Sequence, residues 1–283
     1  EKYVMSLETC IGPELDIFEE SSEHADRIVV NSPILSHKKF NLLIKNKKFK
    51  VKRFLLEYDR EDSLEEILIK LCEDVLASVK ENYSIIVLDE KQTSFNKPVI
   101  SALLATSAIH NYLIKNNERV SCNIIVNTAS ARDTHQIACL IGFGATCVHP
   151  WLGLQTVLKI GKQRELDSPG NELCASYRKS LNNGLLKIMS KMGISNISSY
   201  RGAGLFEVVG FSEKINKVCF PKNETLIFGD CFKDIERKSL EVIDSDKDSK
   251  VLPKGLHKFV HGGEEHAYQP GVVIELQNSL KEG

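Results

Sequence analysis

Residues 121–150 read SCNIIVNTASARDTHQIACLIGFGATCVHP, and this stretch decides the fold class. It begins with a short β-branched run that predicts a buried strand, and it ends with a second predicted strand, ATCVHP. Between them lies a helical segment that we expect Ser130 with Asp133 to cap and Gly142 to end. Parallel strands need a crossover of this kind, whereas antiparallel strands can be joined by a tight turn. The stretch therefore predicts a β-α-β unit with parallel strands.

The same alternation extends upstream to about residue 51. Ser63 with Glu66 forms the expected capping box of a helix whose leucines, isoleucines and valines fall on one face. The predicted elements are strands at 51–59 and 83–90 and helices at 62–80 and 99–114. Repeated strand–helix units predict an α/β fold with a mostly parallel sheet covered by helices, either open or closed into a barrel.

The composition limits the classes of partner and the compartment that the sequence supports. The 283 residues include 37 Lys and Arg against 38 Asp and Glu, so the overall charge favours neither a nucleic acid nor an anionic membrane as partner. The eight cysteines lack the close spacing of zinc or iron–sulfur ligands, and we expect reduced thiols, no metal site and an intracellular location. No apolar run is long enough to predict a membrane span. The start, EKYVMSLETC, lacks an initiator Met and indicates a piece of a longer chain.

A polar segment at about 161–175 interrupts the alternation and is the predicted domain boundary. Beyond it, we expect a helix at 176–192, a strand at 193–198 and a helix at 201–210. The charged segment at 233–255 is expected to be loop-rich or mobile. The regular pattern therefore weakens toward the end of the chain.

Several short motifs are too weak to assign a function. GFGAT at 142–146 lies between a helix and a strand, the reverse of the dinucleotide-binding order, and indicates a helix stop. HGGEEH at 261–266 is similar to inverted zinc-protease motifs, but its His spacing differs and its Gly-Gly pair favours a tight polar turn. The basic stretch at 38–53 could suit a nucleic-acid backbone, but a solvated lysine-rich surface is the preferred interpretation. His110 and His135 lie in apolar helical segments and are expected to be structural.

One long segment resembles a known family. KIMSKMGISNISSYRGAGLFEVVGF, at 187–211, is similar to the start of the FMN-binding barrel in the large subunit of glutamate synthase. Further segments resemble the same family in the same order: VMSLETCIGPELDIF, SALLATSAIHNYLI, TASARDTHQIACLIGFGATCVHPWL and HKFVHGGEEHAYQPGVVIELQ. The chain departs from the family at Gly204, Gln136 and His149, where Gln, His and Asn are usual or common.

The resemblance implies a domain division and a function. Residues 1–165 would be the C-terminal part of the glutamate synthase central domain, with a degenerate (β/α) barrel-like architecture. Residues 166–283 would be the incomplete N-terminal portion of the FMN-binding (β/α)8 synthase domain. The family makes L-glutamate from 2-oxoglutarate and glutamine-derived ammonia, using reduced FMN that an iron–sulfur cluster supplies with electrons. This segment would be mainly the scaffold between the amidotransferase and synthase sites, inactive alone and without a tightly bound cofactor of its own.

The resemblance also implies partners and one binding segment. The partners would be the amidotransferase and synthase domains of the same chain and an electron donor, either an NAD(P)H-linked subunit or domain or ferredoxin, in the cytoplasm or alternatively a plastid. Met192, Gly193, Ile194 and Ser195 would end the first strand of the FMN barrel and contact the flavin, because glycine there lets backbone approach the ring. The alternative for Met192 is that it only fills core space. No catalytic residue is assigned.

A second functional class stays open on the residues alone. The basic stretch at 38–53 also suits a stand-alone α/β interaction or nucleic-acid-binding module. Salt-dependent binding to an oligonucleotide would favour this alternative. The two interpretations therefore predict different partners: other domains of the same chain for glutamate synthase, and an oligonucleotide for the stand-alone module.

Overall fold

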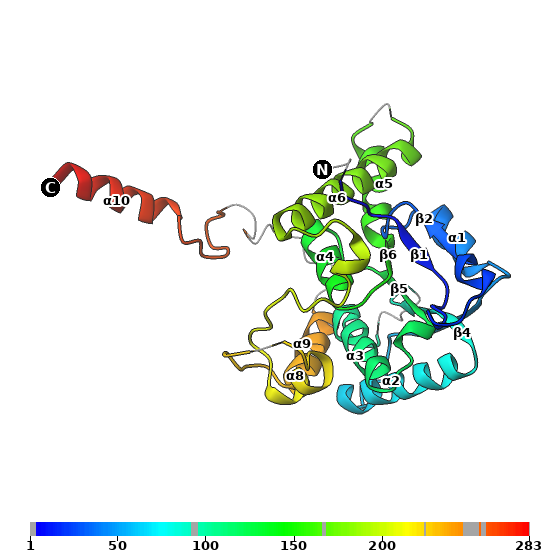
Figure 1. Cartoon of the computed structure of the whole chain (residues 1–283). Coiled ribbons are helices and arrows are strands. Elements are labelled where there is room, and N and C mark those ends of the chain that lie inside the picture. The colour runs from blue at the N-terminus through cyan, green and yellow to red at the C-terminus, as the bar shows by residue number, and fades with distance from the viewer. Residues whose placement is uncertain are drawn as a thin grey trace. The chain divides into compact units, whose positions relative to one another are not determined.

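The computed structural model describes residues 4–91, 96–165, 168–223, 225–245, 255 and 259–282. The chain divides into two compact units, Glu1–Ile243 and Asp244–Gly283. The first unit contains the parallel sheet and the helices that cover it (Figure 1). The second contains α10 (Pro270–Glu282) and a turn closed by a hydrogen bond from Gly263 N to Val260 O, 2.9 Å long. The tight turn predicted within HGGEEH is confirmed.

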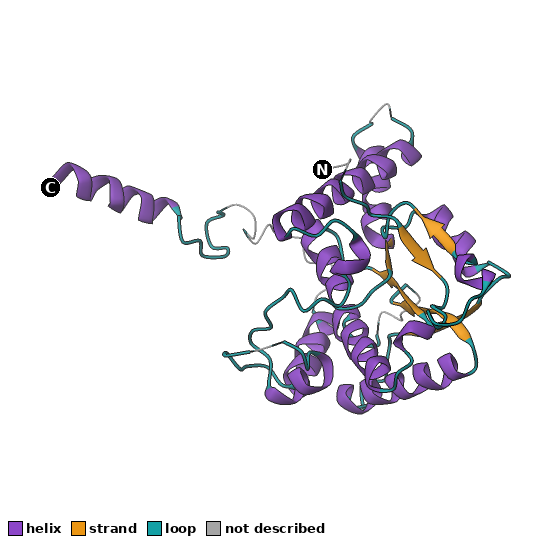
Figure 2. Cartoon of the chain, in the orientation of Figure 1, coloured by secondary structure: helices purple, strands orange, loops and turns teal. Residues whose placement is uncertain are grey.

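Four parallel strands form the central sheet in the order β3-β4-β5-β6 (Figure 2). Their bounds are Lys50–Leu55 for β3, Tyr83–Asp89 for β4, Asn123–Thr128 for β5 and Cys147–Pro150 for β6. Every residue of β5 and β6 is buried, and the central residues of β5, Ile124, Ile125 and Val126, are apolar on both faces, as expected of a strand between two layers. The predicted α/β class and the mostly parallel sheet are confirmed.

Alternate residues of the strands pack into two different hydrophobic layers. Ile86 and Leu88 of β4 face the larger layer, which includes α2 (Leu64–Lys80), α3 (Ala102–Lys115), α4 (Thr134–Gly142) and α6 (Gly170–Met192). Ile85 and Val87 face the smaller layer with α1 (His37–Ile44) and the antiparallel ribbon of β1 (Thr9–Ile11) and β2 (Ile28–Val30). Figure 1 shows α1 and this ribbon together on one side of the sheet. Both faces are therefore covered, as the sequence pattern predicts.

The sheet edge at β6 is extended by a segment without a strand of its own. Val148 N donates to Pro33 O and Leu35 N donates to Val148 O, each at 2.8 Å. The other edge is β3, where Lys50, Lys52 and Arg53 place positive charge along the strand. Charged side chains of this kind discourage edge-to-edge pairing with other strands. Much of the basic stretch at 38–53 thus lies on α1 and this edge strand.

Two predicted helix caps are wrong in detail. Ser63 makes no side-chain cap, and Leu64 N at the start of α2 instead donates to Glu236 Oε1 at 2.6 Å. Glu236 comes from α9 (Phe232–Asp244), far along the chain, so no local motif could indicate it. At α4 the N-cap is Asp133, which forms the capping box with Gln136. That box lies three residues after the predicted one.

The segment after α6 also differs from the prediction. Residues 193–198 form an isolated bridge, Ser6 with Asn196, and the start of the short helix α7 (Ile197–Tyr200), so the predicted strand is wrong. Residues 201–210 are irregular, so the predicted helix there is wrong as well. The reason is tertiary: Gly202 N donates to Gly142 O at 2.9 Å, and Gly202 has a left-handed φ of 65° that interrupts a helix.

The remaining elements complete the first unit. They are η1 (Ser22–Ala25), η2 (Arg119–Ser121), α5 (Trp151–Gln163) and α8 (Glu213–Cys219). Helices α5 and α6 contact each other on either side of the predicted domain boundary at 161–175. The first half of the charged segment at 233–255 is α9 rather than loop, and the rest, apart from Ser245 and Gly255, lies outside the described residues.

Candidate functional site

The four residues predicted to contact a flavin lie at the end of α6 and just beyond it. Gly193 is left-handed, with φ of 70°, and Ile194 N donates back to Met189 O at 3.0 Å, which closes the helix. Ser195 O accepts a 2.8 Å hydrogen bond from Ser6 N. The segment is thus fixed by backbone contacts to the beginning of the chain.

The two methionines at this helix end differ in their exposure to solvent. Met189 is fully buried and packs in the larger layer, as expected from its place on the apolar face. Met192 is 44% exposed, so within this chain it does not merely fill core space. Ile194 packs partly against the core, and a Cβ added to Gly193 would meet no atom within 4 Å. Met192 and Gly193 therefore lie on the surface of this chain.

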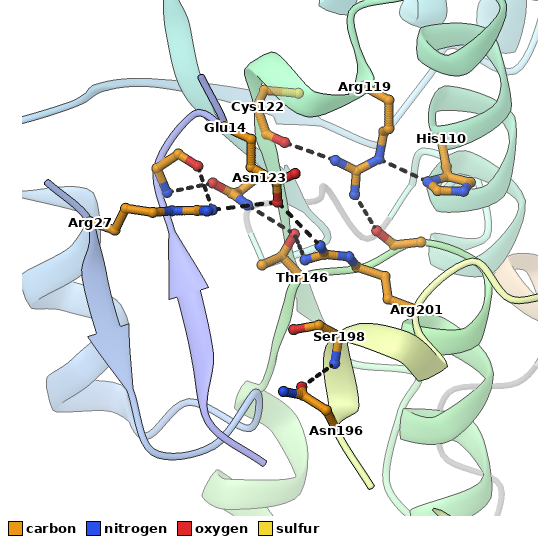
Figure 3. Close-up of polar contacts among 12 residues, drawn as sticks. Glu14, Arg27, His110, Arg119, Cys122, Asn123, Thr146, Asn196, Ser198 and Arg201 are labelled. Atoms are coloured by element: carbon orange, nitrogen blue, oxygen red, sulfur yellow. Dashed lines mark hydrogen bonds and ion pairs between the residues drawn. The ribbon is translucent and has the colours of Figure 1, made fainter. Parts of the chain in front are cut away.

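A polar cluster lies at the amino-terminal ends of β5 and β6 (Figure 3). Arg201 Nη1 donates to Thr146 Oγ1 at 3.3 Å, and Asn123 Oδ1 accepts from Gly12 N at 2.6 Å. Glu14 Oε1 lies between two guanidinium groups, 3.7 Å from Arg27 and 3.9 Å from Arg201. These contacts fasten β1 and the turn after α7 to the same end of the sheet.

Arg119 and His110 form the most enclosed part of this cluster. Arg119 Nε donates to His110 Nδ1, and its two terminal nitrogens donate to Cys122 O and Gly144 O, all at 2.8 Å. Burial, and secondarily the Arg119 charge, lowers the pKa of His110 to about 3. His110 is therefore neutral with Nδ1 as acceptor, and its predicted structural role is confirmed. His135 differs, because it is exposed and contacts Cys139 Sγ at 3.5 Å.

A second network crosses the carboxyl ends of the parallel strands, where α/β proteins place their ligands. Asp89 ends β4, Asn127 lies near the end of β5, and His149 lies near the end of β6; all three are buried. Asn127 Nδ2 donates to Asp89 Oδ1 at 2.8 Å, and His149 Nδ1 lies 2.6 Å from Asn127 Oδ1. Arg53 Nε on β3 lies 2.5 Å from Asp89 Oδ2 as an ion pair without hydrogen-bond alignment. We call this chain of contacts, with His37, the strand-end relay.

The protons of the strand-end relay can be assigned from its geometry. Asn127 donates through its nitrogen, so its oxygen accepts, and His149 Nδ1 must carry a proton. Burial, followed by the nearby His37, lowers the pKa of His149 to about 3, so the ring is neutral and Nε2 is an acceptor. His37 Nδ1, 2.9 Å away, is then the donor. His149 also stacks on Phe40, with ring centroids 4.4 Å apart.

Glu90 holds the loop that follows β5. Its carboxylate accepts hydrogen bonds from Thr128 Oγ1 at 2.7 Å, Ala129 N at 2.6 Å and Ser130 Oγ at 2.9 Å. A carboxylate with this many donors is a structural clamp. The sequence carried a signal for both networks, because each buried run ends in polar residues: VLDE, IVNT and CVHP. Such polar strand ends indicate a site, because the carboxyl ends of parallel strands meet at one edge of the sheet.

Metal-binding clusters and thiols are two further kinds of chemistry that the described residues could carry. No group of three His, Cys, Asp or Glu side chains among them is arranged to hold a metal ion. All eight cysteines are free thiols, and burial raises the pKa of Cys72 and Cys147 to about 12. A thiol with so high a pKa is a poor nucleophile. No helix in the described ranges is long and apolar enough to cross a membrane.

Comparison with known proteins decides the family. The sequence model described as "Glutamate synthase central domain" matches residues 1–212. The chain belongs to this family. It is 32% identical over 304 aligned residues to the ferredoxin-dependent glutamate synthase of rice (Oryza sativa subsp. japonica), covering 100% of this chain and 19% of the relative. It is 28% identical to glutamate synthase [NADH] of Saccharomyces cerevisiae, covering 99% and 14%.

A bacterial relative is similar to the same degree. The large chain of glutamate synthase [NADPH] of Bacillus subtilis is 31% identical over 288 residues, covering 98% of this chain and 18% of the relative. The chain thus spans less than a fifth of the length of each of these relatives. Among solved structures, a mutant flavocytochrome b2 with benzoylformate matches 60% of this chain and 38% of its own at 16% identity, with a TM-score of 0.40.

Proposed function

We propose that this chain is a segment of a glutamate synthase that makes L-glutamate from 2-oxoglutarate and glutamine-derived ammonia with reduced FMN. Within that enzyme the segment would be mainly the scaffold between the amidotransferase and synthase sites. The observation that carries the proposal is similarity to glutamate synthases along essentially the whole chain. The stand-alone interaction or nucleic-acid module is not favoured by these relatives.

The scaffold role is supported by the two polar networks. Both ends of the strands carry mutually hydrogen-bonded side chains: the part-buried Arg119 with the buried His110 at the amino ends, and the buried Asp89, Asn127 and His149 at the carboxyl ends. Buried networks of this kind fix the relative positions of the elements that carry them. A rigid domain is what a spacer between two active sites requires, and the segment would hold no cofactor of its own.

The proposal also divides this chain between two domains of the whole enzyme. Residues 1–165 would belong to the central domain, and residues 166–283 would lead into the FMN-binding synthase domain. In the complete enzyme Met192, Gly193, Ile194 and Ser195 would contact FMN. The exposure of Met192 and the open space at Gly193 support this part of the proposal.

Cofactors and electron donor belong to the rest of the enzyme. FMN and an iron–sulfur cluster would be held by the synthase domain. Relatives named for ferredoxin, NADH and NADPH match at 32%, 28% and 31% identity, so the segment is common to enzymes with different donors. We propose a cytoplasmic location, with the plastid as the alternative, because the rice relative is described as chloroplastic.

A segment exchange tests the scaffold proposal. This chain would replace the matched 288-residue alignment region of the Bacillus subtilis large chain, and the chimera would be purified with its small chain. We expect bound flavin and formation of glutamate from glutamine and 2-oxoglutarate. A chimera that binds flavin and hydrolyses glutamine but forms no glutamate would contradict the proposed role as a spacer between the two sites.

A further inference from the structure

A groove of about 540 Å³ lies between three helices, and none of the hydrogen-bonding residues of the strand-end relay lines it. Its floor is apolar and comes from α2, α3 and α8: Ile69, Cys72, Ala108 and Val218. Cys72 and Ala108 are almost fully buried, whereas Ile69 is 39% exposed. The volume falls within the range of small-molecule sites, which are mostly apolar with a few polar groups at defined places.

The polar groups of the groove are mainly positive. Lys115 ends α3, Lys217 belongs to α8, and Lys222 follows α8, and all three line the groove. Lys217 pairs with Glu213 on its own helix, but both side chains are about 70% exposed or more, so the pair is weak. Across the described part of the chain, no ion pair involves Lys115 or Lys222. The groove therefore combines an apolar floor with unneutralised positive charge at its mouth.

Two neutral groups add specificity to the mouth. Asn111 directs its side-chain nitrogen inward, to Ser107 O at 2.9 Å and Cys219 O at 3.0 Å. Because both amide hydrogens are used on the protein, Asn111 Oδ1 is the end left for a ligand. Tyr112 contributes a half-buried ring and a phenol to the same wall. A ligand with an apolar body and one anionic group would match the residues that line this groove.

We propose that this groove binds an amphipathic organic monoanion, an aromatic or aliphatic carboxylate whose head group meets Lys115 and Lys222. A polyphosphate would leave the apolar floor unused, and a neutral hydrocarbon would leave the ammonium groups without a partner. A ligand in this place bridges α2, α3 and α8, and so stabilises the packing of α8 on the sheet layer. The proposal is independent of the enzyme to which the chain belongs.

Binding of 2-naphthoate to the 283-residue chain tests the proposal, with 2-naphthamide as the uncharged probe of the same shape. Isothermal titration should show one saturable site for naphthoate and at least about tenfold weaker binding of the amide. The K115Q/K222Q variant should lose about tenfold in naphthoate affinity. The K70Q/K80Q variant has the same net charge and changes two exposed lysines of α2 that do not line the groove, and its affinity should be unchanged.

A second variant tests the apolar floor. I69W places an indole ring in the groove and should abolish naphthoate binding. Because Ile69 is partly exposed, the variant should keep the unfolding midpoint of the native chain. Methyl NMR signals of Ala108 should shift on addition of naphthoate to the native chain. The proposal is overturned by any of three results: no saturable binding, equal affinity for the amide, or equal losses in K115Q/K222Q and K70Q/K80Q.

Discussion

At the scale of single residues, His110 shows how one side chain organises several loops. Its Nδ1 accepts from Arg119, and two glycines lie directly against its ring, Gly144 and Gly202. A Cβ built on Gly202 would lie 2.6 Å from His110 Nε2, closer than real contacts allow. The histidine therefore explains the glycine in a segment that the sequence pattern presents as a helix.

Gly202→Ala tests this packing. The variant should lose about 2–4 kcal/mol of unfolding free energy. Alanine disfavours the left-handed backbone conformation at this position, and its methyl group would also clash with His110. Gly204→Ala is the matched control, since Gly204 has nearly the same φ, 68°, but open space around it. Its cost should be only about 1–2 kcal/mol. Equal losses in urea unfolding would show that the ring does not constrain Gly202.

The buried histidines also predict a pH dependence. His110 and His149 have folded-state pKa values of about 3, whereas an unfolded histidine has a pKa of about 6.5. The unfolded chain thus binds more protons, so their contribution to stability is complete above pH 6.5 and is lost as pH falls toward 3. Each histidine should contribute a slope of about 1.4 kcal/mol per pH unit between roughly pH 6 and 5. Urea unfolding over that window should show a shallower slope for His149→Gln than for the native chain; identical slopes would contradict the neutral relay.

At the scale of helices and strands, the regular periodic segments were predictable and the contacts between distant segments were not. The strands β3 to β6 and the helices α2, α3, α4 and α6 were predictable, because buried strands leave short β-branched runs and helices buried on one face leave a helical period in the sequence. The segment at 193–210 was mispredicted because its conformation depends on Ser6 and Gly142, which lie far away along the chain. The sequence marks the polar ends of these strands, but only the sheet brings Asp89, Asn127 and His149 into contact.

The cap of α2 is an element-scale case of the same effect. Glu236→Ala should cost about 1 kcal/mol, because Leu64 N loses a charged acceptor at a helix N-terminus while alanine preserves α9. Ser63→Ala should cost less than about 0.5 kcal/mol, since Ser63 makes no side-chain cap. Thermal or urea unfolding of the two variants gives the comparison. A larger loss of unfolding free energy for Ser63→Ala than for Glu236→Ala would favour the local capping box of Ser63 with Glu66 instead.

At the scale of the whole molecule, the proposed flavin contact at Gly193 can be separated from its structural role. Gly193→Asn keeps a residue type that tolerates the left-handed conformation, and nothing lies within 4 Å of the new Cβ. The 283-residue chain should therefore keep its unfolding free energy within about 0.5 kcal/mol. In the complete protein the added side chain should reduce bound flavin, measured by absorbance after purification. Full flavin content would show that Gly193 only ends α6.

The central claim is that this chain is one segment of a much longer glutamate synthase. The most direct measurement is to isolate, with antibodies against the 283 residues, the native protein that contains them and to assay it with glutamine, 2-oxoglutarate and an electron donor. We predict a polypeptide several times longer than the chain, since the relatives are more than five times its length. It should carry flavin and form glutamate. A polypeptide of only these 283 residues, without flavin and without glutamate formation, would contradict the account.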